Sequence, residues 1–169
     1  MRETLTCAAA LTAMLATPAW ADGHNDTIAN DPKPVIAAAD AFFAALRSPD
    51  KTALRATMID EAVIFVHDRR KPDAPITRIV AAGDHLDGWE TSPPGTDEYM
   101  SYDTVLVDGR MAHVWGPYVF LLNGKPTHCG INSMSFAKTQ DGWRVANTSF
   151  TMTALNECKP LGAPEGPSE

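Results

Sequence analysis

Residues 108–143, DGRMAHVWGPYVFLLNGKPTHCGINSMSFAKTQDGW, decide the fold of this chain. The stretch holds three Asx-Gly pairs, Asp108-Gly109, Asn123-Gly124 and Asp141-Gly142, at intervals of 15 and 18 residues. Asn-Gly and Asp-Gly supply the positive φ angles that tight hairpin turns need, and the segments around them are rich in strand-forming residues. The pattern predicts an antiparallel meander of four strands, over residues 99–107, 111–122, 126–138 and 143–155.

The predicted strands are unusually long. Strands of about 12 residues would extend roughly 40 Å if straight, about twice the usual length, so the sheet has to bend. Pro117 cannot donate to a ladder and Gly130 packs no side chain, so we expect the bend where these two residues meet. The concave side of the bend predicts a pocket, without indicating which molecule enters it or whether a reaction follows.

The turn at Asn123-Gly124 also predicts a register, because a two-residue turn pairs residues whose numbers sum to 247, as 123 and 124 do. The pairs on one face are Trp115 with Asn132, Pro117 with Gly130, and Val119 with His128. If the sheet is concave toward the helices, the expected pocket wall consists of Trp115, Val119, His128 and Asn132. The opposite face then carries Tyr118, Phe120, Cys129 and Ile131. A bulge that shifts the register by one residue would exchange the two faces.

Helical patterns precede the meander. Residues 34–47 place Val35, Ala39, Phe42 and Leu46 on one stripe, which predicts an amphipathic helix wide enough to cover a sheet. Ser48-Pro49-Asp50 restarts a helix, with Ser48 as its N-cap. Residues 62–67 and 76–80 are expected as strands, and residues 81–90 as a brief third helix. This order predicts an α+β fold, with three helices on one side of a strongly curved antiparallel sheet.

The N-terminus has the pattern of a secretory signal. Residues 1–21 contain Arg2, an apolar run over residues 5–15, Pro18 and then Ala19-Trp20-Ala21, which predicts cleavage before residue 22. The apolar run is too short to cross a membrane, and no run of about 18 apolar residues follows. We therefore expect a soluble protein of the periplasm or, alternatively, of the extracellular space.

The composition of the rest suggests how the exported chain is organised. A flexible segment is expected over residues 22–31, one domain over 32–158, and a disordered tail over 159–169.

The net charge is −7, and it stays −7 after cleavage because Arg2 and Glu3 leave together. An acidic surface disfavours nucleic acid and anionic membranes as partners.

Cysteine usage predicts one disulfide. Cys7 leaves with the signal, so Cys129 and Cys158 remain as candidates for a bridge in an oxidising compartment. Closing a loop of about 30 residues contributes up to roughly 3.5 kcal/mol on the chain-entropy model. The alternative is a buried thiol at Cys129 and a free thiol at Cys158. A catalytic thiol is disfavoured, because no partner lies nearby in the sequence.

A family resemblance rests on four short motifs, at residues 114–120 (VWGPYVF), 123–125 (NGK), 128–130 (HCG) and 141–145 (DGWRV). The sequence resembles exported bacterial members of the nuclear transport factor 2-like (NTF2-like) superfamily, which are SnoaL-like proteins, in the subgroup named lumazine-binding. The resemblance implies a cone of curved sheet closed by three helices, often a homodimer through the outer sheet face. The superfamily includes ketosteroid isomerases, polyketide cyclases and binding proteins without chemistry, so the resemblance implies no particular function.

His128 is the candidate catalytic residue, as a general base beside Asn132, which would polarise a carbonyl. The alternative is structural: a histidine hydrogen-bonded within the sheet, and an asparagine satisfied by its neighbours. Asp103 and His67 are further polar candidates, although alternation alone does not place them in the pocket.

No metal or other cofactor is expected. His113 and His128 lie about six residues apart along the paired strands, which is roughly 20 Å. The other histidines have no ligand spacing around them, and the sequence has no phosphate-binding loop or paired cysteine motif.

Three functions fit the sequence. The first is an exported protein that binds a small apolar or aromatic molecule, stacked on Trp115 and oriented by His128 and Asn132. The second is a cofactor-free isomerase, dehydratase or cyclase, which needs a titrating histidine or a carboxylate of raised pKa in the cavity. The third is a structural or partner-binding homodimer whose cone is filled by its own side chains. A cavity of at least a few hundred Å³ would argue against this third function.

Overall fold

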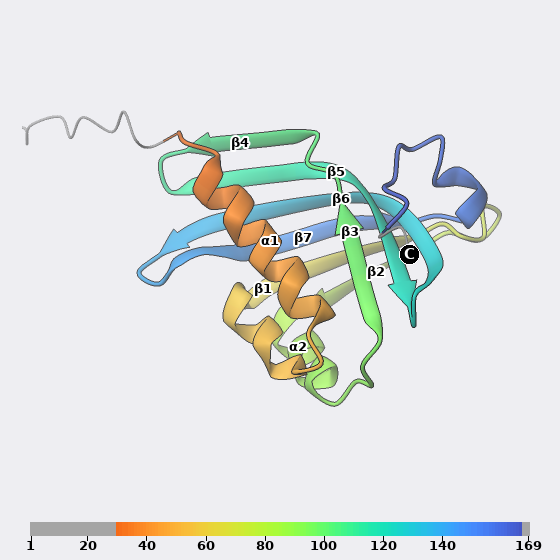
Figure 1. The fold of residues 1–169 in the computed structure, drawn as a ribbon, viewed down its shortest axis with the longest axis horizontal. Helices are drawn as coiled ribbons and strands as arrows, with labels where there is room; N and C mark the ends of the chain where they lie inside the picture. Colours follow the sequence, from red (N-terminus) through yellow and green to blue (C-terminus); the bar gives the residue numbers. More distant parts are fainter. Residues whose placement is uncertain (1–29, 167–169) are drawn as a thin grey trace, which may run out of the picture.

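The computed structural model describes residues 30–166, which form an α+β fold with a curved sheet on one side of a helical layer (Figure 1). The helices are α1 (Lys33–Arg47), the 3-10 helix η1 (Lys51–Thr57), α2 (Ala82–Glu90) and a final short 3-10 turn, η2 (Leu155–Glu157). The strands are β1 (Met58–Asp68), β2 (Ile76–Ala81), β3 (Thr96–Met100), β4 (Thr104–Asp108), β5 (Met111–Leu122), β6 (Lys125–Thr139) and β7 (Gly142–Met152). The predicted fold class is confirmed.

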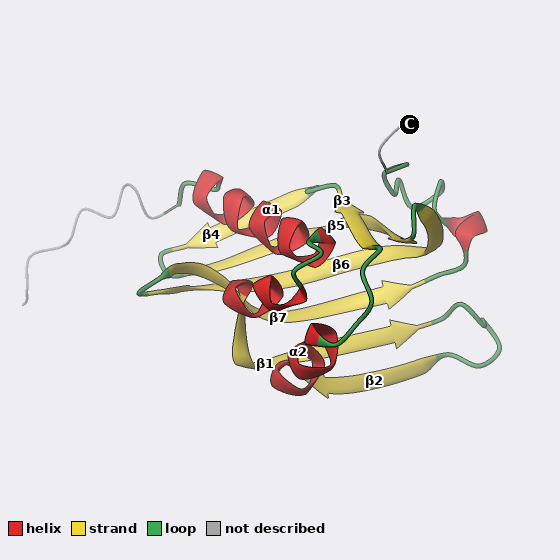
Figure 2. Cartoon of the chain, turned by 60° about the horizontal axis from the view of Figure 1, so that its bottom comes forward, coloured by secondary structure: helices red, strands yellow, loops and turns green. Residues whose placement is uncertain are grey.

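The three helices that precede β3 cover one face of the sheet (Figure 2). The buried stripe of α1 includes Val35, Ala39, Phe42 and Leu46, as the periodicity predicts. The helix expected after Ser48 is instead the 3-10 helix η1. Its N-cap is Asp50, whose carboxylate accepts a hydrogen bond from the Thr52 amide at 3.1 Å.

The sheet has the strand order β2-β1-β7-β6-β5-β3, with β4 also paired to β5. Every pairing is antiparallel except that of β1 with β7, which is parallel. This parallel pairing was not foreseen from the sequence. It brings the β1–β2 hairpin beside the C-terminal strand, and so completes the wall on which α2 packs.

The strand predicted over residues 99–107 is two strands, β3 and β4, which both pair with β5. Between them the Ser101 amide donates to Pro117 O at 2.9 Å. The backbone here passes so close to Gly116 that a Cβ on that residue would lie 1.7 Å from Ser101 O. The link between β3 and β4 therefore passes along the edge of β5 at a position that only glycine allows.

The turn between β5 and β6 forms as predicted, with φ of 51° at Asn123 and 74° at Gly124. The predicted register is wrong beyond the first pairs, because a bulge lies between Phe120 and Leu121. Phe120 pairs with His128 and Leu121 with Pro126, so Thr127 is the extra residue. Trp115 consequently lies opposite Ser133 instead of Asn132. The bulge exchanges the faces of β5 relative to β6.

Gly130 of β6, where the bend was expected, pairs with Tyr118 and not with Pro117. A Cβ on Gly130 would lie 1.8 Å from Thr151 O. Beyond this point β6 and β7 meet only in the isolated bridge between Cys129 and Thr153. The close approach of the two backbones accompanies the curvature of the long β5–β6 hairpin, whose end curves beside β3 in Figure 1.

The predicted disulfide between Cys129 and Cys158 is confirmed, with 5.5 Å between the two Cα atoms. After it the chain makes a turn in which the Ala163 amide donates to Cys158 O at 3.0 Å. The predicted signal over residues 1–21 lies outside the described residues. The division of the chain into segments stays a prediction.

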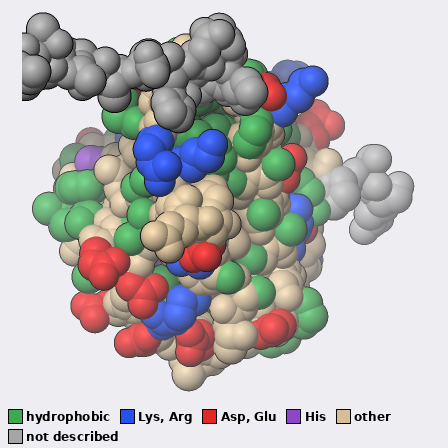
Figure 3. Space-filling model, turned by 90° about the vertical axis from the view of Figure 1, so that its left-hand side faces the viewer, with side chains coloured by type: hydrophobic (Ala, Val, Ile, Leu, Met, Phe, Trp, Pro, Cys, Tyr) green, Lys and Arg blue, Asp and Glu red, His purple; other side chains and the backbone are tan. Residues whose placement is uncertain are grey.

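The end of the molecule seen in Figure 3 carries acidic side chains with basic ones among them. In the helical layer, Arg55 of η1 pairs with Asp60 of β1 and with Asp87 and Glu90 of α2. These ion pairs tie three elements together. Within residues 30–166, no helix is long and apolar enough to cross a membrane.

Candidate functional site

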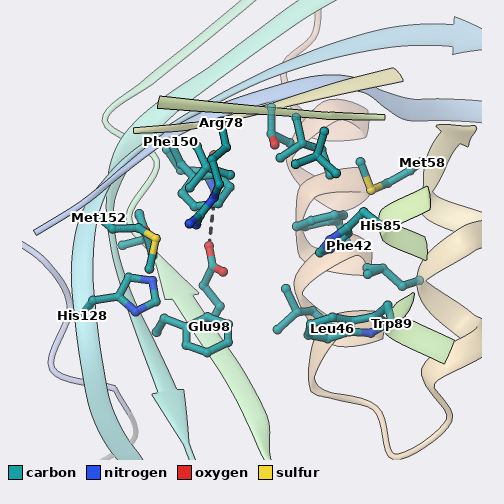
Figure 4. Close-up of a pocket in the computed structure, with 18 residues that line it drawn as sticks. Phe42, Leu46, Met58, Arg78, His85, Trp89, Glu98, His128, Phe150 and Met152 are labelled. Atoms are coloured by element: carbon teal, nitrogen blue, oxygen red, sulfur yellow. Dashed lines mark hydrogen bonds between the residues drawn. The ribbon is translucent and has the colours of Figure 1, made fainter. Parts of the chain in front are cut away.

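A cavity of about 340 Å³ lies between the helices and the inner face of the sheet (Figure 4). Most of its lining is apolar and includes Phe42 and Leu46 from α1 and Val66 and Phe150 from the sheet. Its polar lining residues are Arg78, His85, Glu98, His128, Asn132 and Thr148. A few polar groups on an apolar wall are typical of a site for a small molecule.

The strand pairings align Glu98, Phe120 and His128 across the inner face. Glu98 of β3 pairs with Phe120 of β5, which pairs with His128 of β6. Asn132 lies four residues farther along β6, opposite Gly116. The Asn132 amide nevertheless reaches Glu98 of β3, on the other side of β5, with 3.2 Å between Asn132 Nδ2 and Glu98 Oε1.

The Glu98 carboxyl is a strongly perturbed acid of the cavity. The residue is 7 % exposed, and burial raises the pKa of its carboxyl to about 8. Asn132 Nδ2 donates to Glu98 Oε1 at 3.2 Å, and the charge of Arg47 also opposes the rise, but neither offsets the lost hydration. Glu98 is therefore mainly a neutral carboxylic acid at pH 7, and it can gain or lose a proton near physiological pH.

Two buried polar atoms of the cavity residues have no hydrogen-bond partner. They are Asn132 Oδ1, an acceptor on the sheet side, and Trp89 Nε1, a donor on the helical side. A buried polar atom without a partner costs roughly 1–3 kcal/mol. A ligand that pairs with either atom recovers part of this cost.

His128 is held as a neutral imidazole. Burial lowers its pKa to about 4, and its ring stacks on Phe120 with centroids 5.1 Å apart. The Thr127 hydroxyl lies 2.9 Å from His128 Nδ1 and 3.3 Å from Phe120 O, so a hydrogen bond with Thr127 fixes the orientation of the imidazole ring.

The structure brings two of the four predicted pocket residues, His128 and Asn132, onto the cavity wall. Trp115 is 44 % exposed and Val119 is buried opposite Cys129, and neither lines the cavity. The bulge is the reason, since it places Tyr118 and Phe120 on the inner face of β5 in their stead.

The two further polar candidates also lie elsewhere. Asp103 is exposed in the link between β3 and β4. His67 contacts Thr77 and Ser149 through its two ring nitrogens. Within residues 30–166, no group of three or more histidine, cysteine, aspartate or glutamate side chains is arranged to hold a metal ion.

Glu98 was missed by the sequence analysis. It lies in the polar run Thr96–Met100, and the first meander strand was expected to begin at Tyr99. The only signal was alternation, because Thr96, Glu98 and Met100 share one face of β3. Asp97, which points the other way, has the same charge and gives no hint of which carboxyl is buried.

Comparison with known proteins rests on structure, since the chain matches no family model and no curated protein. An NTF2-like protein of unknown function from Shewanella baltica superposes with a TM-score of 0.53 at 11% identity, over 72% of this chain and 93% of that one. The fold is NTF2-like.

Another similar structure is the beta subunit of an inferred aromatic-ring-hydroxylating dioxygenase from Novosphingobium aromaticivorans. It has a TM-score of 0.58 and 12% identity, over 73% of this chain and 90% of that one. At such low identity the likeness concerns the fold alone, and NTF2-like proteins differ widely in function.

Proposed function

We propose that this protein binds a small, largely apolar molecule in the cavity, oriented by Glu98 and Asn132. The observation that carries the proposal is the buried Glu98 carboxyl, hydrogen-bonded to Asn132 on an otherwise apolar wall. Burial of a carboxyl and an amide costs free energy unless their polar atoms are hydrogen-bonded. The buried Asn132 Oδ1 has no partner and is therefore available to a ligand. A cavity of about 340 Å³ argues against a cone filled by its own side chains.

A matched pair of probes tests this function. 2-Naphthol offers an aromatic body and one hydroxyl, and naphthalene lacks the hydroxyl. We expect 2-naphthol to bind at least roughly fivefold more tightly, since one buried hydrogen bond contributes about 1 kcal/mol or more. Fluorescence titration of the wild type measures both affinities, and native mass spectrometry of the protein purified from its host detects a retained molecule.

Two variants locate the binding. Asn132→Leu should abolish the preference for 2-naphthol over naphthalene. Trp115→Leu, on the outer face, should leave both affinities unchanged. Absence of binding by the wild type, or loss of binding only in Trp115→Leu, would contradict the proposed site.

A second candidate function is acid–base catalysis, and the raised pKa of Glu98 favours it specifically. A carboxylate whose pKa lies near the working pH can take a proton from a carbon next to a carbonyl and return it elsewhere. Glu98 replaces His128 as the best candidate base, because His128 has its pKa lowered to about 4.

Proton exchange tests the catalytic function without knowledge of the natural substrate. Exchange of the α-protons of 2-tetralone in D₂O, followed by NMR, should accelerate with the wild type and rise with pH toward 8. Glu98→Gln should remove the acceleration and keep binding of the ketone. Equal exchange rates for the two proteins would reduce Glu98 to a binding residue.

The setting of the protein completes the proposal. The disulfide suits an oxidising compartment, and we place the protein in the periplasm, exported by its N-terminal signal, with the extracellular space as the alternative. From the resemblance of its sequence motifs, we also propose that the protein belongs to the SnoaL-like, lumazine-binding subgroup.

A homodimer through the outer sheet face is also proposed. The exposed Leu106, Met111 and Trp115 support it, because the pairing of β4 with β5 puts them on one face. Sedimentation of the wild type and of Trp115→Lys measures the oligomeric state. A monomeric wild type would exclude the dimer.

A further inference from the structure

Arg78 lines the cavity from β2 at a place where solvent also reaches it. It pairs with Val66 of β1, so the two side chains lie on the same inner face of the sheet. Figure 4 shows the Arg78 side chain extending into the cavity near Phe150. An exposed residue that also lines a cavity marks the cavity's mouth.

Arg78 differs from the other arginines in residues 30–166. Arg47, Arg55, Arg69, Arg70 and Arg144 each form an ion pair with a carboxylate, and Arg110 donates to a backbone carbonyl. Within the same part of the chain, the Arg78 side chain forms neither an ion pair nor a hydrogen bond. Asp68 interacts with Arg78 through space, and its carboxylate already accepts two hydrogen bonds from the Arg70 side chain.

We propose that the ligand carries an anionic group, such as a carboxylate, which the Arg78 guanidinium binds at the mouth of the cavity. This inference rests on the proposed binding function and names the chemical class of the ligand. An arginine presents a fork of donors that matches a carboxylate in two parallel hydrogen bonds. A local cation is also what an acidic protein of net charge −7 needs in order to attract an anion.

The sheet register defines the shape of such a ligand. Arg78, Val66, Phe150 and Asn132 lie at one level across four neighbouring strands. With about 4.8 Å between strands, the backbones of Arg78 and Asn132 are roughly 14 Å apart along the sheet. Val66 and Phe150 form an apolar floor between them. The geometry therefore fits an elongated molecule with an anion at one end, an apolar middle, and a hydrogen-bond donor that reaches Asn132 Oδ1.

The experiment compares 4-phenylbutyrate with 4-phenylbutanamide, which differ chiefly in charge. Isothermal titration calorimetry at pH 7 should give at least roughly tenfold tighter binding of the acid to the wild type. Arg78→Met should reduce this preference to less than twofold and leave the affinity for the amide unchanged. Arg78→Lys should restore part of it, because it keeps the charge and loses the fork.

The matched control is Arg69→Met, which removes the same charge from the link of the same β1–β2 hairpin, at a residue that does not line the cavity. It should keep the preference for the acid. Equal binding of acid and amide by the wild type, or equal effects of Arg69→Met and Arg78→Met, would overturn the role of Arg78 while the binding function stands. Failure of both probes to bind the wild type, together with failure of 2-naphthol, would overturn the binding function and this inference with it.

Discussion

The interior of the cavity and the hairpin end beside it each hold one perturbed carboxyl, and the two are shifted in opposite directions. In the interior, burial raises the pKa of Glu98 to about 8. At the end of β1, hydrogen bonds from Arg70 lower the pKa of Asp68 to about 2. The Glu98 carboxyl accepts its hydrogen bond from the Asn132 amide, whereas the Asp68 carboxyl accepts from the Arg70 guanidinium.

This difference shows how one fold keeps a neutral acid and a fixed anion a few strands apart. Desolvation dominates where apolar side chains from the helices cover the sheet, and a paired cation dominates where solvent reaches it. The interior thus suits hydrogen bonding and proton transfer, and the hairpin end suits recognition of charge.

The largest effect on stability should follow from a substitution that disturbs the curvature of the sheet around the cavity. A Cβ at Gly130 would lie 1.8 Å from Thr151 O, and backbone cannot be displaced as a flexible side chain can. We expect Gly130→Ala to lower the free energy of unfolding by at least about 3 kcal/mol, or to prevent folding. Urea denaturation followed by circular dichroism measures the loss.

Gly88 provides the control for this substitution. It lies within α2, and a Cβ there would meet nothing within 4 Å. Gly88→Ala should leave the fold intact and raise the free energy of unfolding by up to about 1 kcal/mol, because alanine favours the helix. If Gly130→Ala proved as stable as the wild type, the bend would not depend on the close approach to β7.

A smaller effect should appear in the pH dependence of stability, through Glu98. Folding raises the pKa of Glu98 from 4.5 to about 8. The contribution of Glu98 to the free energy of unfolding is therefore fully present below pH 4.5 and is lost as the pH rises to 8. His128, whose pKa is lowered to about 4 from 6.5, adds stability as the pH rises over pH 4 to 6.5. The two slopes oppose each other below pH 6.5, and only that of Glu98 remains above it.

The wild type should therefore lose about 1–2 kcal/mol of unfolding free energy between pH 6.5 and 8, relative to Glu98→Gln. Glutamine keeps the shape and accepts the hydrogen bond from Asn132, but it does not ionise. Urea denaturation of both proteins at several pH values gives the difference, in which other titrating groups cancel. Parallel curves for the two proteins would mean that Glu98 ionises normally.

The fold could be predicted from the sequence because its signals are local. The turn at Asn123-Gly124 and the amphipathic stripe of α1 each depend on a few neighbouring residues, and both are present as predicted. The parallel pairing of β1 with β7 depends on the whole sheet and left no such mark.

The site could be predicted only in part, for two physical reasons. A single bulged residue, Thr127, moved Trp115 and Val119 off the cavity wall, because one residue of slip exchanges the faces of a strand. Glu98 is buried through contacts with elements distant in sequence, so its neighbours along the chain make it look like an ordinary surface acid. His128 and Asn132 lie on the wall because the expected face of β6 was the right one.

The smallest effect on stability should come from Asp68 at the hairpin end, where an ion pair and not burial perturbs the carboxyl. Asp68→Asn removes the anion that Arg70 contacts at 2.6 and 2.9 Å. Because folding lowers the pKa of Asp68 from 3.8 to about 2, its contribution is present above pH 3.8 and is lost as the pH falls toward 2.

We therefore expect Asp68→Asn to cost about 1 kcal/mol at pH 7 in low salt, less in 1 M salt, and almost nothing at pH 2. The control is Asp73→Asn, an exposed residue of the same hairpin, which makes the same change in net charge. A larger loss in Asp68→Asn than in Asp73→Asn, which shrinks with salt, would show that the ion pair with Arg70 is responsible. Equal losses would mean that the hairpin end responds to net charge alone, and its contrast with the interior would then rest on Glu98 only.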